Sequence, residues 1–280
     1  MRTYNSGPAL MQQIRETRLP DHALALWALG QEGFLVKYGE TKILFDPYLT
    51  NWVFELAGEP WSRRFVSPLA PEDCEEIDYV IISHHHEDHM DKQTLQALSR
   101  HEQTKFIVPR AHLSLIRSWG IREEQLIGIS HLEIVELSGD LSLEAHAAMH
   151  EQLEQNEEGE HLYLGYVLSL GDIRLYHSGD TIGFPELVAW LQVKQADIAM
   201  LPINGRDYVR RGSGIAGNTN YREAVDIGAA IGADLLIPMH FGLFPHNDEN
   251  PAYFVDYLYS HYPEQRFHMF TPGERFIYMK

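Results

Sequence analysis

The segment ISHHHEDHMD (82–91) contains four histidines and three acids directly after a short apolar run. Within it, the pattern H-x-H-x-D-H is formed by His84, His86, Asp88 and His89. In an extended turn between a strand and a helix, residues two positions apart can point the same way, so His84 and His86 can hold one cation. Asp88 and His89 would then face a neighbouring position. Because imidazole and carboxylate groups suit Zn²⁺, Mn²⁺ or Fe²⁺, the pattern predicts two ligands for each of two adjacent metal ions.

The remaining residues of this segment have other expected roles. Asp91 is placed to cap a helix that carries Leu95 and Leu98. His85 and Glu87 fall between the ligands and are expected to bind no metal, with His85 structural or facing solvent. The alternative for the whole segment is a solvated turn that caps a helix, but such a turn does not require four ligand-type residues in this order.

Three further segments indicate the elements that would position these groups. IDYVIISHHH (77–86), ADIAMLPING (196–205) and ADLLIPMH (233–240) each have an Asp, a continuous apolar run and then polar residues or histidine. Continuous apolar runs are typical of strands buried on both faces, with helices packed outside. In such sheets functional groups gather beyond the carboxyl ends of the strands. The segments therefore predict an α/β fold that brings their polar residues to one rim.

The rest of the chain supports this organisation. Segments 33–46 and 165–180 both read as hairpins that end at an Asp, which indicates either two related half-units or merely two common hairpins. Helices are expected at 109–119, 220–231 and 251–262. Since no linker divides the sequence, we expect a single domain over residues 1–280. Residues 1–22 form an N-terminal extension that is expected to be helical.

Composition excludes several classes of function. The net charge is −18 and the pI about 5.2, so the chain lacks the basic face needed to bind nucleic acid or an anionic membrane. The one cysteine, Cys74, rules out an intramolecular disulfide and a cysteine-based metal site. No segment approaches ~18 uninterrupted apolar residues, and the N-terminus has no apolar core of a signal peptide. We expect a cytoplasmic protein with a small anionic molecule as its partner.

The pattern H-x-H-x-D-H after an apolar strand resembles the signature of the metallo-β-lactamase superfamily. The resemblance extends from about Trp27 to His240 and implies an αβ/βα four-layer sandwich of two similar halves, with a di-metal site at one edge. AHAAMHE, YHSGDT and IPMHFG match the superfamily's later ligands in order. The match implies His150 as the third ligand of the first metal, Asp180 as a bridge and His240 as a ligand of the second. Asp46, in FDP, matches a position that supports the site.

Two assignments have alternatives within the sequence. His146 alternates along the predicted strand LSLEAH and is the rival third ligand, although His150 fits the superfamily's spacing better. His177, in YHSGD, is expected to pack beside Asp180 or to orient a ligand from outside the metal's own shell.

A di-metal site of this kind predicts hydrolysis. Two divalent ions roughly 3.5–4 Å apart can share one water and lower its pKa from ~15.7 toward ~7. A metal-bridging hydroxide would then be the nucleophile, and Asp88 would orient it or accept its proton. The expected substrate carries an ester-like bond, whether in a lactone, thioester, lactam or phosphodiester.

Substrate contacts are expected beyond the second buried strand, where arginines and asparagines lie among glycines. Arginine can bind a phosphate or carboxylate with two parallel hydrogen bonds. The alternative is an exposed loop with salt-bridging arginines. Arg63 and Arg64 are a second arginine pair of this kind. The candidate contacts are Asn204, Arg206, Arg210, Asn220 and His246.

Within the superfamily the chain looks most like the UlaG-like L-ascorbate-6-phosphate lactonases. The similar segments are ALWALGQEGFLVKYGETKILFDP, LYHSGD and LLIPMHFGLFPHNDENP. This resemblance implies a lactonase that acts on a small phosphorylated sugar-acid lactone with two Mn²⁺ or Zn²⁺ ions, or Fe²⁺. The alternatives are a metallo-phosphodiesterase or phospholipase-D-like hydrolase, which shares the L-W-x-x-G opening, and a non-catalytic metal-binding protein. The aromatic segment PAYFVDYLYSHY could serve a homo-oligomer interface or be buried in the monomer.

Overall fold

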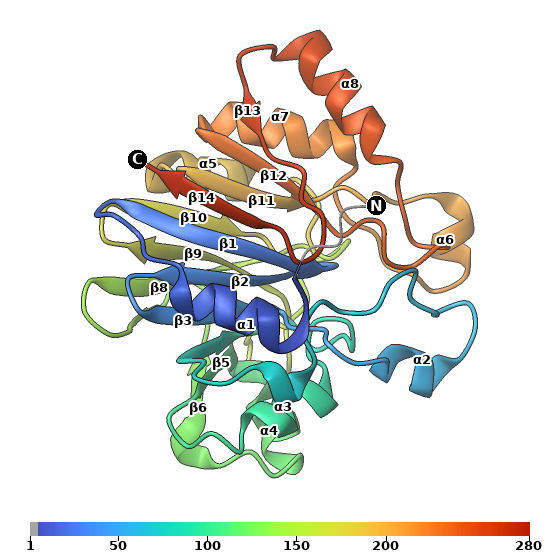
Figure 1. Cartoon of the computed structure of the whole chain (residues 1–280). Helices are drawn as coiled ribbons and strands as arrows, with labels where there is room; N and C mark the ends of the chain where they lie inside the picture. Colours follow the sequence, from blue (N-terminus) through green and yellow to red (C-terminus); the bar gives the residue numbers. More distant parts are fainter. Residues whose placement is uncertain (1–4) are drawn as a thin grey trace. The chain divides into compact units, whose positions relative to one another are not determined.

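The computed structural model describes residues 5–280, which form two compact units (Figure 1). Unit 1 comprises the described residues up to 128 together with 270–280, and unit 2 comprises 129–269. The predicted single domain over 1–280 stays a prediction. Of the N-terminal extension, Gly7–Glu16 is helical, as expected, and residues 1–4 lie outside the described residues.

Unit 1 is built on a mixed seven-stranded sheet in the order β14-β1-β2-β3-β4-β5-β6. Its strands are β1 (Ala23–Gly30), β2 (Gly33–Tyr38), β3 (Thr41–Phe45), β4 (Tyr79–Ile81), β5 (Lys105–Pro109), β6 (Leu126–Ile129) and β14 (Arg275–Met279). Strands β14, β1, β2 and β3 pair antiparallel, whereas β3, β4 and β5 pair parallel. The hairpin predicted at 33–46 is confirmed as β2–β3, and the first of the three predicted buried strands is β4.

The helices of unit 1 are α1 (Gly7–Glu16), α2 (Trp52–Ala57), α3 (Lys92–Leu98) and α4 (Leu113–Ser118), with short 3-10 turns at Pro71–Asp73, Arg110–His112 and Glu123–Gln125. Three of the four, α1, α3 and α4, contribute apolar side chains to the core beside this sheet. Asp91 caps α3 as predicted, since its carboxylate accepts from the backbone N–H groups of Gln93 and Thr94. The helix expected at 109–119 begins later, because Pro109 ends β5 and a 3-10 turn follows.

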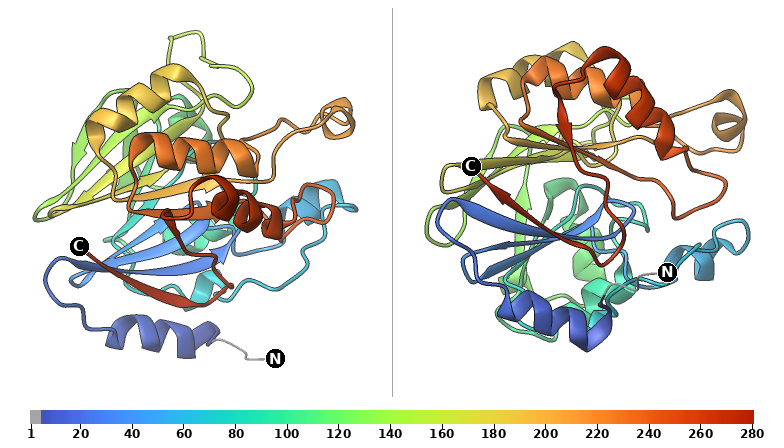
Figure 2. Two further views of the ribbon diagram at one scale, coloured as in Figure 1. Left: turned by 90° about the horizontal axis from the view of Figure 1, so that it is seen from above. Right: turned by 45° about the horizontal axis from the view of Figure 1, so that its top comes forward.

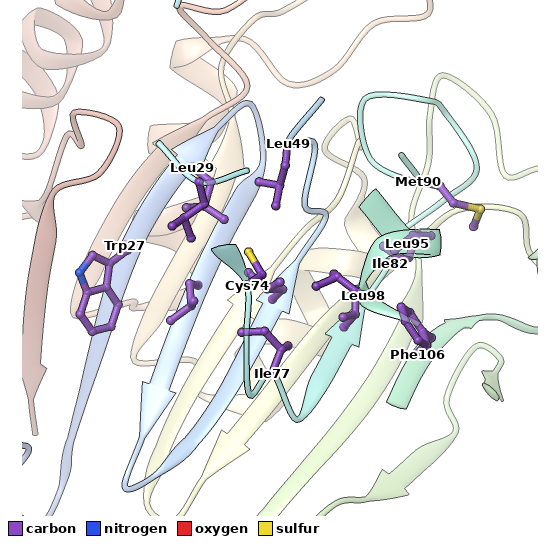
Figure 3. Packing of buried hydrophobic residues seen from close by; sticks show 14 of the residues in the cluster. Trp27, Leu29, Leu49, Cys74, Ile77, Ile82, Met90, Leu95, Leu98 and Phe106 are labelled. Atoms are coloured by element: carbon purple, nitrogen blue, oxygen red, sulfur yellow. The ribbon is translucent and has the colours of Figure 1, made fainter. Parts of the chain in front are cut away.

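The core of unit 1 follows from the alternation of side chains along its strands. Alternate residues of β1 are buried in one cluster with side chains from α1, α3 and α4 (Figure 3). Trp27 and Leu29 enter this cluster from β1, and Leu95 and Leu98 enter it from α3. The helix face predicted to carry these leucines is therefore the face that packs on the sheet.

Unit 2 contains the second seven-stranded sheet, in the order β13-β12-β11-β10-β9-β8-β7. Its strands are β7 (Ile134–Glu136), β8 (Leu141–Ala147), β9 (Leu164–Leu170), β10 (Ile173–His177), β11 (Ile198–Pro202), β12 (Leu235–Met239) and β13 (Arg266–Phe267). Strands β7 to β10 pair antiparallel, and β10 to β13 pair parallel. The predicted hairpin at 165–180 is confirmed as β9–β10, and the predicted buried strands are β11 and β12.

Three helices of unit 2 lie over one face of its sheet (Figure 2). The helices of the unit are α5 (Pro185–Lys194), α6 (Tyr208–Gly212), α7 (Tyr221–Ile231) and α8 (Pro251–His261), of which α5, α7 and α8 form this layer. The helix predicted at 220–231 is α7, which Asn220 caps and which Gly232 ends in the left-handed conformation. Within residues 5–280, no helix has both the length and the apolar character needed to cross a membrane.

A buried lysine on β2 ties helix α1 to the sheet of unit 1. The Lys37 side chain is fully buried, and its Nζ donates to the carbonyls of Ile14, Arg15 and Thr17 at 3.1, 3.1 and 2.9 Å. The last carbonyls of a helix have no partner within the helix, and a cation there also interacts favourably with the helix dipole. Lys37 therefore satisfies the C-terminus of α1, although burial lowers its pKa.

Replacing Lys37 with methionine removes these three donors while keeping a side chain of similar length. We expect the free energy of unfolding to fall by roughly 1–3 kcal/mol, because the Thr17 carbonyl loses its donor. The Ile14 and Arg15 carbonyls still accept from the Thr17 N–H and from the Arg18 side chain. Urea unfolding monitored by circular dichroism measures the change. Lys105→Met is the matched control, since Lys105 donates to one carbonyl at an exposed position. Equal stabilities of the two variants would contradict this role of Lys37.

Candidate metal centre

In unit 1 the ends of two parallel strands bring the candidate residues together. Asp46 follows β3 directly, and Ser83 and His84 follow β4. Phe45 is paired with Ile81, so both strands end at the same edge of the sheet, and the Asp46 N–H donates to the Ile81 carbonyl at 3.0 Å. Asp46 has a φ of 38°, in the left-handed region that side chains with a Cβ rarely adopt. The strand pairing holds this backbone in place.

The buried carboxylate of Asp46 is the centre of a hydrogen-bond network. It accepts from the Ser83 N–H at 2.7 Å and from the Ser83 hydroxyl at 2.5 Å. It also lies 2.8 Å from Nδ1 of His89, which donates to it because an ionised carboxylate can only accept. The proton on Nδ1 makes Nε2 the nitrogen of His89 that can ligate a metal.

Ser83 fixes the tautomer of the other buried histidine, His84, in the same way. Its Oγ lies 2.9 Å from Nδ1 of His84, and its single proton is already donated to Asp46. His84 must therefore donate from Nδ1, which makes Nε2 its ligand nitrogen. That nitrogen lies 3.0 Å from Nδ1 of His86. Asp46, His84 and His89 form a buried group that could hold a metal ion.

Asp88 is oriented by a residue that the sequence reasoning missed. Gln31, in the turn between β1 and β2, donates from Nε2 to Oδ2 of Asp88 at 2.8 Å. The other oxygen of Asp88 lies 3.7 Å from Nε2 of His89. The neighbouring Glu32 is fully buried, with a carboxylate oxygen 3.9 Å from Nδ1 of His89. Only the QEG sequence of the turn, polar between two apolar strands, could have pointed to these two residues.

Unit 2 gathers the other candidate ligands around one carboxylate. Asp180 follows β10, His240 follows β12 directly, and His150 lies shortly after β8; all three are buried. Oδ2 of Asp180 is 3.6 Å from Nε2 of His150, and Oδ1 is 3.4 Å from Nε2 of His240. Each oxygen of Asp180 thus faces a different histidine, as a bridging carboxylate would. His240, like Asp46, has a left-handed backbone, with φ at 56°.

The separations between these atoms are close to those around a divalent ion. Two ligand atoms about 2.0–2.2 Å from a tetrahedral ion lie about 3.3–3.6 Å apart. The two pairs of Asp180 in unit 2, at 3.6 and 3.4 Å, fall in this range. In unit 1 the His84–His86 pair is shorter, at 3.0 Å, and the Asp88–His89 pair is slightly longer, at 3.7 Å. The donors are imidazole nitrogens and carboxylate oxygens, which suit Zn²⁺, Mn²⁺ and Fe²⁺. The two pairs of Asp180 are therefore suited to holding an ion between their atoms.

The structure places the alternative histidines elsewhere. The ring of His146 lies 4.6 Å from that of Trp190 and 4.7 Å from that of His131, whereas His150 lies beside Asp180. His177 ends β10, and its Nδ1 accepts from the Gly179 N–H at 3.3 Å. The backbone between His177 and Asp180 is thereby fixed.

Two residues lie between the proposed ligands of the HxHxDH segment, and their expected lack of a metal role stays a prediction. The ring of His85 packs 4.9 Å from that of His112, and Glu87 is exposed.

The predicted substrate residues of unit 2 are engaged with neighbouring groups. Arg206 pairs bidentately with Glu223, at 2.7 and 2.6 Å, which raises the Arg206 pKa. Arg210 pairs with Asp207 and donates to the Asn204 carbonyl. These arginines thus form the salt bridges of the alternative interpretation.

The remaining three candidates have structural contacts of their own. The Asn204 side chain donates to that of Asn247, Asn220 caps α7, and the His246 ring lies 6.3 Å from that of Phe244. The substrate role of all five residues stays a prediction.

The sequence as a whole is similar to known proteins. A family model described as the beta-lactamase superfamily domain matches residues 41–241. A UPF0173 metal-dependent hydrolase of Nitratidesulfovibrio vulgaris is 28% identical over 248 residues, which cover 88% of this chain and 91% of that protein. Another, from Archaeoglobus fulgidus, is 26% identical over 256 residues, which cover 90% and 98% of the two chains.

Solved structures share the fold. Igni18, a metallo hydrolase from Ignicoccus hospitalis, has a TM-score of 0.72 at 22% identity and covers 92% of this chain and 99% of its own. An isothiocyanate hydrolase from Delia radicum gut bacteria has a TM-score of 0.72 at 19% identity, with 91% and 99% covered. Together with the family match, these likenesses confirm the predicted α/β fold of the metallo-β-lactamase type, with its two mixed sheets.

Replacing Asp46 with asparagine tests its role in orienting the histidines. An amide is neutral and can donate as well as accept. The variant should therefore no longer fix the proton of His89 on Nδ1 or require the Ser83 hydroxyl to donate. We expect metal affinity to fall about 10–100-fold, the range seen when groups that orient metal ligands are removed. Competition with a chelator measures the affinity. Asp78→Asn is the control, because Asp78 accepts a backbone N–H at the opposite end of β3. Equal metal affinity in both variants would show that Asp46 is dispensable.

The packed histidines around His146 predict a pH dependence of stability. Burial and the neighbouring His146 and His161 lower the pKa of His131 to about 4, and its Nδ1 accepts from the Ala147 N–H at 2.9 Å. Below the unfolded-state pKa near 6.5, the unfolded chain binds a proton that folded His131 does not. The free energy of unfolding should therefore fall as pH drops from about 6.5 toward 4.

His131→Gln should flatten this decline, because glutamine can accept the same N–H without titrating. Urea unfolding of chelator-treated protein between pH 4.5 and 7.5 measures it, with His101→Gln as the control. A slope in His131→Gln as steep as in the unchanged protein would exclude His131 as its source.

Proposed function

Because this chain belongs to the β-lactamase superfamily and is a metal-dependent hydrolase, we propose that it hydrolyses an ester-type bond with two divalent ions. The observation that carries the proposal is the set of four ligand pairs, of which the two of Asp180 have separations that suit such ions. The first ion would be held by His84, His86 and His150, and the second by Asp88, His89 and His240. Asp180 would bind both. The ions are Mn²⁺ or Zn²⁺, or Fe²⁺, because the donors include no thiolate.

Two such ions, when bound, lower the pKa of water and polarise the bond under attack. The protein's own contribution is to fix the donors before substrate arrives. Asp46 and Ser83 set the tautomers of His84 and His89. Gln31 donates to Oδ2 of Asp88 and so orients the carboxylate that would position the attacking water or accept its proton. No serine or cysteine nucleophile is needed.

For the substrate, we propose a small anionic lactone such as a phosphorylated sugar-acid lactone. The support is the resemblance of three sequence segments to the UlaG-like lactonases. A phosphodiester substrate is the alternative, because that branch of the superfamily shares the L-W-x-x-G opening. A panel of lactones and phosphodiesters, tested with Mn²⁺- and Zn²⁺-loaded protein, separates the two. We expect lactone opening without diester cleavage. The opposite result would favour the phosphodiesterase, and full metal occupancy without turnover would favour a non-catalytic metal-binding protein.

His86→Ala and Asp180→Ala test the di-metal proposal directly. Each variant should lose bound metal and retain less than about 0.1% of kcat/KM, because loss of a positioned metal ligand removes several kcal/mol of transition-state stabilisation. Elemental analysis and lactone hydrolysis provide the two measurements. His85→Ala is the matched control, since it removes an adjacent histidine that is not a proposed ligand. Full turnover in either His86→Ala or Asp180→Ala would refute the mechanism.

A further inference from the structure

A cavity of about 380 Å³ lies in unit 1 beside helix α2. Its lining includes two arginines, Arg63 and Arg64, and no acidic residue. The chain as a whole has 40 acidic and 22 basic residues, so this composition runs against the overall charge. A cavity lined by one sign of charge concentrates ligands of the opposite sign.

Arg63 has hydrogen-bonding capacity that the protein does not use. Its Nε donates to the Phe65 carbonyl at 3.3 Å, and its Nη1 donates to the carbonyls of Tyr48 and Thr50 at 3.1 and 2.5 Å. A guanidinium has five N–H donors, and these contacts occupy at most three. Nη2 is buried and has no hydrogen-bond partner among residues 5–280. An acceptor is therefore missing from this arginine.

The guanidinium of Arg63 lies 4.5 Å from the centre of the Tyr48 ring, and the charges of Tyr48 and Asp91 raise its pKa against the larger effect of burial. No carboxylate in the described part of the chain forms an ion pair with this guanidinium. The contrast with Arg206 is clear, because Glu223 satisfies both ends of that guanidinium. A bound anion would supply both the missing acceptor and a charge in direct contact with the guanidinium.

The cavity wall is joined to the metal-binding segment of unit 1. Thr50 lines the cavity, and its N–H and hydroxyl both donate to Oδ2 of Asp91, at 3.0 and 2.8 Å. Asp91 lies two residues after His89, and Tyr48 lies two residues after Asp46. A group bound beside Arg63 would thus lie next to the segment that begins at Asp46 and contains Tyr48 and Thr50.

We propose that this cavity binds a carboxylate or phosphate group of a small molecule, with Arg63 as the charged anchor and Phe54 and Phe65 as apolar walls. This inference rests on the proposed function, since it names the part of the hydrolase that recognises the anionic end of the substrate. Arginine suits the role because its planar fork matches both carboxylate and phosphate oxygens.

Anion binding to the metal-free protein tests the cavity without depending on hydrolysis. Inorganic phosphate and succinate are titrated separately into chelator-treated full-length protein, followed by isothermal titration calorimetry. We expect saturable binding of at least one probe. The probe with the lower Kd shows whether the cavity recognises a phosphate or a carboxylate group. Arg63→Gln should weaken that binding at least tenfold. Arg100→Gln, which removes an exposed arginine of the same unit, should leave it unchanged.

Because Arg63 also donates to three backbone carbonyls, the Arg63→Gln variant can fail to fold. A second variant tests the cavity without changing Arg63. Asn51→Asp keeps the size of a cavity-lining side chain and adds a negative charge, so it should weaken anion binding several-fold while Arg63 stays in place. Wild-type protein that binds neither probe would overturn the inference, as would unchanged binding in a folded Arg63→Gln variant. If the anions bind but no lactone or diester is hydrolysed, the cavity stands and the proposed function fails.

Discussion

The buried carboxylate of Asp46 imposes the arrangement on which the metal-binding half of unit 1 depends. A charged group away from water is costly unless donors surround it, and here three donors from Ser83 and His89 do so. Those donors can reach it only because β3 and β4 run parallel and end together. The same network leaves His84 and His89 with their Nε2 atoms as ligands. One interaction thus links sheet register, histidine tautomer and metal affinity.

Unit 2 also has a buried carboxylate that faces histidines. Asp180 faces His150 with one oxygen and His240 with the other, so a carboxylate again organises two imidazoles. Asp46 and His240 both stand directly after a strand and both have left-handed backbones. Such conformations cost energy for residues with a Cβ and persist where the surroundings enforce them, often at functional sites. In each unit, one of the several non-glycine residues with this conformation is thus a candidate to support or provide a metal ligand.

Much of this arrangement could be predicted from local patterns. The continuous apolar runs identified β4, β11 and β12, and the predicted cap at Asp91 identified the start of α3. These features depend on residues close together in the sequence. Gln31 and Glu32 were missed because a hairpin turn brings them to the histidines from more than 50 residues away. The contacts of Arg206 and Arg63 could not be predicted either, because the sequence does not show which arginines form salt bridges in the folded protein.

The proposed function requires seven side chains to hold two ions. The measurement that tests it most directly is anomalous X-ray diffraction from crystals of Mn²⁺- or Zn²⁺-loaded protein. The account predicts two anomalous peaks, each within coordination distance of its own ligands and both touched by Asp180. A single peak, or peaks located away from these side chains, would contradict it. The seven ligands are His84, His86, Asp88, His89, His150, Asp180 and His240.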